Sequence, residues 1–166
     1  MRKPAREQGR GFCSEIDMKH DIPIRITVTG PVPGVAMQVQ KGRDELIPPA
    51  EASARAVSFE FEITVDTSGP VPNFLGKFAQ GPKGQRFVYV NSGTYAGQRN
   101  TCWSRRAKIS LMSITKKQVE ESLSSPGARI EAEIMGTGRD GGPMCASVPI
   151  VGGWRVVNRN RKNSKG

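Results

Sequence analysis

The sequence is short of the residues from which most catalytic and metal sites are built. Its 166 residues include a single histidine, His20, and three cysteines, Cys13, Cys102 and Cys145. No two cysteines lie within four residues of each other, so they form no local zinc or redox pair. One histidine also argues against Ser/His and Cys/His catalysis and against an ordinary histidine-bound metal.

Long apolar runs are missing as well. No run approaches the roughly 20 apolar residues of a transmembrane helix, and the first residues are polar and charged. We therefore expect a cytoplasmic protein with no membrane partner. Gly76 and Gly81 stand five apart as in a Walker loop, but Pro82 follows in place of the usual Gly-Lys-Ser/Thr ending. The sequence thus identifies no cofactor.

Positive charge is in excess, but mostly near the ends of the chain. The formal net charge is +10, from 25 Lys or Arg and 15 Asp or Glu. Residues 1–20 carry five Lys or Arg and three acids, residues 155–166 carry five and none, and residues 21–154 carry 15 and 12. Terminal charge is typical of solvated tails, with a loose grip on nucleic acid or an acidic partner as the alternative. The net charge alone therefore does not predict nucleic-acid binding.

Glycine and proline are frequent, with 19 and 12 residues, and both favour turns over helices. Between them, apolar and polar residues alternate as in strands with one buried face. Such runs predict strands at 22–28, 35–40, 57–65, 86–90, 106–111, 128–134, 144–150 and 154–157. Because a Gly/Pro turn joins the first two runs, we expect them to form a hairpin.

One segment, residues 115–124, predicts a helix. Thr115 is a suitable N-cap, and Val119 and Leu123 share one face at i and i+4. The expected fold class is therefore mainly β with one helix (α+β), a small antiparallel barrel or two-sheet sandwich of about eight short strands. We expect a disordered extension at 1–20, a single β-rich domain at 21–157 and a disordered basic tail at 158–166.

The glycine-rich stretch 73–90 is the first candidate site. Its glycines let backbone N–H groups approach a ligand, and nearby cations suit a phosphate or carboxylate. A structural loop packed by its own apolar residues is the alternative. The candidate ligand-binding residues, which include one arginine beyond the stretch, are Gly76, Gln80, Gly81, Arg86, Tyr89 and Arg105.

The second candidate is the basic run around Trp103. Arg106 and Lys108 share one face of the predicted strand, whereas Arg105 has the parity of the core-facing residues and needs an anionic or carbonyl partner. Basic residues interleaved with aromatic ones can stack single-stranded bases. The alternative nucleic-acid set is therefore Trp103, Arg106 and Lys108, with Tyr89 beside it.

Several phrases resemble those of a small bacterial family known only as a domain of unknown function. They are Phe74-Leu75-Gly76, Gln80-Gly81-Pro82, Arg86-Phe87-Val88-Tyr89, Arg105-Arg106-Ala107-Lys108 and Gly142-Pro143-Met144-Cys145-Ala146, and the resemblance spans about residues 22–157. It implies a bacterial, single-domain, cytoplasmic protein and brings no catalytic residue, cofactor or substrate with it.

Three functions stay open at this point. The first is a small soluble domain that binds an anionic small molecule or a protein partner at a concave pocket near Arg86 and Arg105. The second is single-stranded nucleic-acid binding through the basic and aromatic face and the basic tails. An uncharacterised enzyme is the third and has the least support. The carboxylate pairs Glu60/Glu62 and Glu131/Glu133 lie on the polar faces of amphipathic strands, which is typical of a solvated surface.

Overall fold

The computed structural model describes residues 18–42, 45–76, 79–80, 86–93, 103–136, 146–147 and 150–158, with the backbone alone at 79–80, 103–106 and 146–147. The terminal segments expected to be disordered fall almost entirely outside these residues. So do Gly81 of the first candidate site and the three cysteines.

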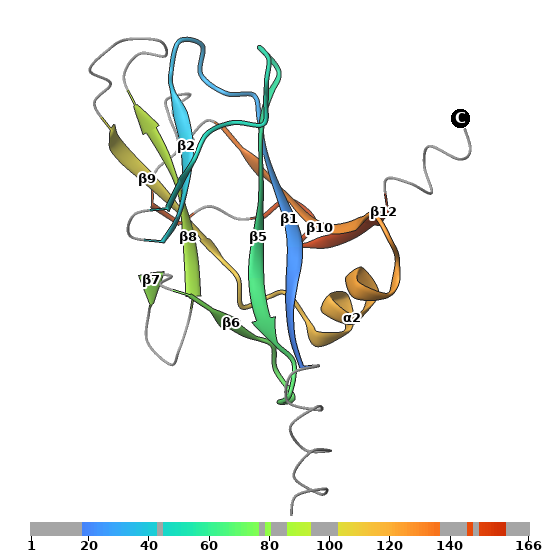
Figure 1. The fold of residues 1–166 in the computed structure, drawn as a ribbon. Helices are drawn as coiled ribbons and strands as arrows, with labels where there is room; N and C mark the ends of the chain where they lie inside the picture. Colours follow the sequence, from blue (N-terminus) through green and yellow to red (C-terminus); the bar gives the residue numbers. More distant parts are fainter. Residues whose placement is uncertain are drawn as a thin grey trace, which may run out of the picture.

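The strands form two six-stranded sheets (Figure 1). Sheet A has the order β12 (Arg155–Asn158), β10 (Ala128–Met135), β1 (Lys19–Thr29), β5 (Ala56–Asp66) and β4 (Glu51–Ala52), and β6 (Asn73–Leu75) also pairs with β5. Sheet B has the order β11 (Ala146–Ser147), β9 (Trp103–Ser110), β8 (Arg86–Gly93), β2 (Met37–Gly42) and β3 (Glu45–Ile47), and β7 (Ala79–Gln80) also pairs with β8. The expected fold class, mainly β with one helix, is confirmed.

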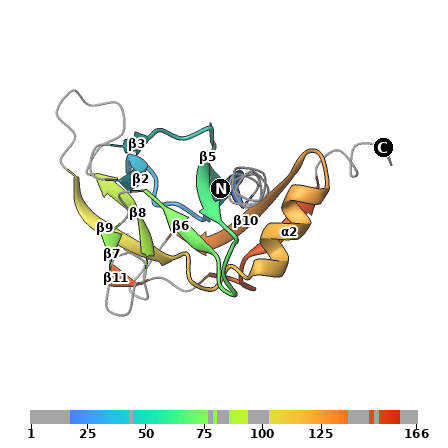
Figure 2. The same ribbon diagram turned by 60° about the horizontal axis from the view of Figure 1, so that its bottom comes forward.

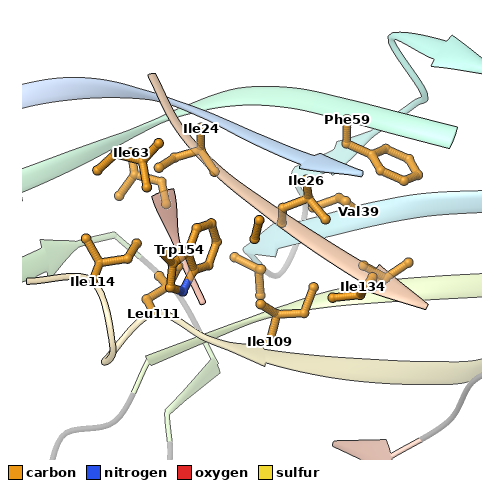
Figure 3. Close-up of a cluster of buried hydrophobic side chains, with 14 of the residues drawn as sticks. Ile24, Ile26, Val39, Phe59, Ile63, Ile109, Leu111, Ile114, Ile134 and Trp154 are labelled. Atoms are coloured by element: carbon orange, nitrogen blue, oxygen red, sulfur yellow. The ribbon is translucent and has the colours of Figure 1, made fainter. Parts of the chain in front are cut away.

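The core lies between the two sheets. Figure 3 shows Ile24, Ile26 and Phe59 of sheet A pointing toward Val39 and Ile109 of sheet B. All five side chains are at most 1 % exposed, because alternate residues of each strand face the same interior. The helix α2 (Lys116–Ser124) covers the β10–β12 end of sheet A, away from β8 and β9 (Figure 2).

The predicted hairpin of the first two runs is wrong. β1 pairs with β5 antiparallel and with β10 parallel, whereas β2 pairs with β3 and β8 in the other sheet. The turn between them contains Gly30 and Gly34, with φ angles of 62° and 79°. These left-handed conformations suit glycine, and they carry the chain from sheet A to sheet B instead of folding it back on β1.

The helix begins as its sequence predicts, but its buried face differs. Thr115 is the N-cap, and its side chain and that of Gln118 form a reciprocal capping box. Val119 is fully buried, whereas Leu123 is 40 % exposed. The second buried position is Ser122, at i+3 from Val119, because the helix is rotated so that this small residue faces the sheet.

All eight predicted runs contain a strand, and the additional strands are short. β3, β4, β6 and β7 have two or three residues each and lie between the predicted runs. β1 begins at Lys19, so His20 lies in the strand opposite Val65, ahead of the expected domain boundary. No helix of the described residues is long and apolar enough to cross a membrane.

Candidate functional site

The outer face of sheet B, turned away from the core, gathers polar and aromatic side chains from three strands. Val39, Val90 and Ala107 lie opposite one another in the register and are buried, so the positions next to them on each strand belong to the outer face. The outward positions form two rows across β2, β8 and β9. One row is Gln40, Tyr89 and Lys108, and the other is Gln38, Asn91 and Arg106.

A β-bulge changes the phase of β9 at its first residues. Arg105 lies opposite Ser92, but Gly93 lies opposite Trp103, so Ser104 has no partner position on β8. Simple alternation would place position 103 in phase with Arg105. The bulge instead places it in phase with positions 106 and 108, which belong to the outer face. Three residues of the alternative nucleic-acid set therefore occupy one face of sheet B.

The described side chains of this face interact with one another. The Lys108 ammonium lies 5.0 Å from the centre of the Phe87 ring, which is within the range of a cation–π contact. Lys108 is exposed, and Phe87 and Tyr89 are half-buried. Asn91 is 5 % exposed, and its Nδ2 donates a hydrogen bond of 3.2 Å to Oε1 of Gln40. The described part of the face thus combines an exposed ammonium group, two half-buried aromatic rings and a buried amide.

The two sheets differ in the sign of their charge. The strands of sheet B contain five cations, Lys41, Arg86, Arg105, Arg106 and Lys108, and one acid, Glu45. The strands of sheet A contain four cations, Lys19, Arg25, Arg129 and Arg155, and seven acids, Asp21, Glu51, Glu60, Glu62, Asp66, Glu131 and Glu133. Of these cations, Arg106 and Lys108 lie at outer-face positions, whereas Arg86 and Arg105 have the parity of the buried residues Val88 and Ala107.

Most of the charged side chains on the strands of sheet A form ion pairs with one another. Arg25 pairs with Glu51 and Glu60, and Arg129 pairs with Glu60 and Glu131. Partial burial alone would lower the pKa of Arg25. The hydrogen bond that Arg25 donates to Glu51 and the charges of the nearby glutamates outweigh that effect and raise its pKa above the usual value. Glu60 and Glu131 are thus engaged in a network rather than simply solvated.

The first candidate set is divided between two places. Arg86 begins β8 opposite Gln80, and Gly76 follows β6 with a φ of 134°. Arg105 lies opposite Ser92, six residues further along β8. At about 3.3 Å per residue this separation is roughly 20 Å. The backbone positions of the two arginines therefore lie near opposite ends of β8.

A hollow of about 580 Å³ lies between α2 and β12, away from the outer face of sheet B. Its lining residues are Gln118, Glu121, Glu131, Trp154, Arg155, Val156 and Val157. None of them belongs to the sequence-predicted sites. No local motif marks them, because strands and a helix distant in sequence bring them together.

Sequence reasoning also missed the amides of sheet B and one glycine pattern. Gln38 and Gln40 share a face in the alternating run 35–40, but only the pairing with β8 reveals their neighbours. The glycines at positions 136, 138 and 141 have the spacing of a dinucleotide-binding fingerprint after β10. That fingerprint requires a helix directly afterwards. Residues 137–145, where that helix would begin, lie outside the described residues.

Within the described ranges, no group of three or more His, Cys, Asp or Glu is placed to hold a metal ion. Residues 22–157 match the model of a family described as a family of unknown function (DUF5990). We found no curated protein and no solved structure that matches the chain.

Proposed function

The chain belongs to that family of unknown function (DUF5990), and from the geometry of its own residues we propose that the outer face of sheet B binds single-stranded nucleic acid. The observation that carries the proposal is the β9 bulge, which puts Trp103 in phase with Arg106 and Lys108 on the face that contains Tyr89. Stacking platforms between cations are the usual means of binding single strands.

The spacing of the face suits an extended ligand better than a compact one. Phe87 and Tyr89 are two residues apart on β8, which separates them by about 6.6 Å. Tyr89 and position 93, opposite Trp103, are about 13 Å apart. An extended single strand can place bases against the half-buried Phe87 and Tyr89, with the exposed Lys108 beside them to contact a phosphate, whereas Asn91 and Gly93 further along β8 are buried.

The charge difference between the sheets supports one-sided binding. The acid-rich strands of sheet A repel a polyanion, so the ligand prefers sheet B. The basic segments at the ends of the chain can add an unspecific electrostatic contribution. We propose in addition that the protein is cytoplasmic and that residues 21–157 form a single domain, which agrees with this function.

The affinity of the chain for a fluorescein-labelled single-stranded oligonucleotide of about 12 nucleotides tests the proposal through fluorescence anisotropy at several salt concentrations. We expect Lys108→Gln to weaken binding about threefold to tenfold and to reduce the salt slope by about 0.7. Trp103→Leu should cost about 1–3 kcal/mol of binding free energy through the lost stacking.

Lys19→Gln is the matched control, because Lys19 is an exposed lysine on a strand of sheet A. It should change the affinity much less than Lys108→Gln does. Binding that is independent of salt, or that both lysine variants weaken equally, would contradict the proposal.

A second candidate function is the binding of a small anion at the Arg86 end of β8 alone. Gln80 remains beside Arg86, and both lie at the end of β8 opposite to Trp103. A compact phosphate or carboxylate would use that end alone. Loss of inorganic phosphate binding in Arg86→Gln, with oligonucleotide binding absent in the native chain, would favour this second function.

A further inference from the structure

β12 is the longest of the edge strands that the structure describes in the two sheets. It forms one end of sheet A, pairs with β10, and has four residues. The other edge strands have two or three residues each; they are β3, β4, β6, β7 and β11. Natural proteins commonly keep exposed edge strands short, since an unpaired edge is a template for another strand.

The hollow between α2 and β12 lies along this edge. Three consecutive residues of β12 line it, Arg155, Val156 and Val157. Consecutive residues of a strand point to opposite faces, so a hollow that contacts all three borders the edge of the strand rather than one face. No strand of the described residues pairs with β12 on the side away from β10.

The walls of the hollow favour a basic occupant. Glu121 of α2 is exposed, and its carboxylate takes part in no ion pair within the described part of the chain. Glu131 also lines the hollow, but its carboxylate is paired with Arg129, and Arg155 is 54 % exposed at the rim. The buried indole of Trp154 and the half-buried Val156 and Val157 provide an apolar floor.

We propose that β12 binds an extended peptide as an added strand of sheet A, with a lysine or arginine of the peptide beside Glu121. Main-chain hydrogen bonds to the edge would supply affinity, and alternate side chains would supply specificity. A second copy of the chain is a poorer occupant. Pairing two β12 edges would bring the two Glu121 walls together between molecules of net charge +10.

The test uses the full chain with Trp103→Phe, which leaves Trp154 as the one tryptophan of the sequence. The probe is the blocked peptide Thr-Val-Lys-Val-Lys-Val-Thr, and its controls are the same peptide with N-methyl groups on alternate amides and a version with Glu in place of Lys. We expect the Lys peptide to change the emission of Trp154 and to bind with a dissociation constant of about 10 μM to 1 mM. The amides of Val156 and Val157 should gain protection from hydrogen exchange, whereas the N-methyl peptide should not bind.

A matched pair of variants tests the role of Glu121. Glu121→Gln should weaken binding of the Lys peptide about threefold to tenfold, whereas Glu120→Gln, next to it on the exposed part of α2 and outside the hollow, should not. The proposal fails if about 1 mM Lys peptide leaves Trp154 and the β12 amides unchanged. Equal binding of the N-methyl peptide, or concentration-dependent protection of β12 without any peptide, would also overturn it.

Discussion

At the scale of the residue, Gly136 shows how little room the chain leaves where β10 ends. A Cβ atom at this position would lie 2.8 Å from Cα of Pro31 and 2.9 Å from the carbonyl oxygen of Gly30. The N–H of Gly136 also donates a hydrogen bond of 2.7 Å to the carbonyl oxygen of Thr29. The close approach fixes the end of β10 against the turn that leaves β1.

The substitution Gly136→Ala should therefore destabilise the fold. The obstructing atoms belong to the backbone, so relief requires a shift of the turn, and we expect a loss of about 1–3 kcal/mol in the free energy of unfolding. Gly69→Ala is the control, since the nearest atom to its Cβ would be 3.9 Å away. Urea denaturation measures both, and equal losses for the two variants would show that the contact at Gly136 has no special role.

At the scale of the element, the start of α2 depends on its capping box. The hydroxyl of Thr115 accepts a hydrogen bond of 3.1 Å from the Gln118 N–H, and the Gln118 side chain accepts one from the Thr115 N–H. Gln118 also donates a hydrogen bond of 2.7 Å to the carbonyl oxygen of Trp154. The cap thus links the helix to the segment that leads into β12.

Thr115→Ala should lower the free energy of unfolding by about 1 kcal/mol, because it leaves an N–H of the first turn without its acceptor. Thr115→Ser keeps a hydroxyl at the same position and should recover most of that loss. Thermal unfolding followed by circular dichroism measures the two variants. If Ser and Ala had the same effect, the methyl group of Thr115 rather than its hydrogen bond would be responsible.

The elements themselves were largely predictable from the sequence, and their pairing was not. Alternation in runs such as 57–65 depends on local burial, so it located β5 directly. The partner of a strand depends on contacts between distant segments. The Gly/Pro turn after β1 therefore predicted a change of direction but not that the chain would enter the other sheet.

The candidate site was predictable to a similar extent. The parity of Arg105 with Ala107 follows from alternation, and the register agrees with it. The phase of Trp103 does not, because the bulge that shifts it appears only when β9 pairs with β8. The hollow beside β12 had no local signal, since Glu121 and Val157 meet only through the packing of α2 on sheet A.

At the scale of the whole molecule, the distribution of charge matters more than its sum. The net charge of +10 reflects the terminal segments, and it hides the acid-rich strands of sheet A. Opposite signs on the two sheets orient any charged partner. This arrangement is consistent with two ligands of different charge, an anionic one on sheet B and a basic peptide beside β12.

The shared core predicts that the two sheets unfold together. Ile63 of sheet A and Ile109 of sheet B are at most 1 % exposed and belong to the same buried cluster. The indole N–H of Trp154 also donates a hydrogen bond to the carbonyl oxygen of Ser110, at the end of β9. Ile63→Val and Ile109→Val should each cost about 1 kcal/mol of unfolding free energy. For the proposed single domain at 21–157, each substitution should shift the unfolding transitions of both tryptophans equally.

Urea titrations of the Trp103→Phe and Trp154→Phe backgrounds follow the two tryptophans separately. A shift of the Trp103 transition by Ile109→Val without a shift of the Trp154 transition would mean that sheet B unfolds as an independent unit.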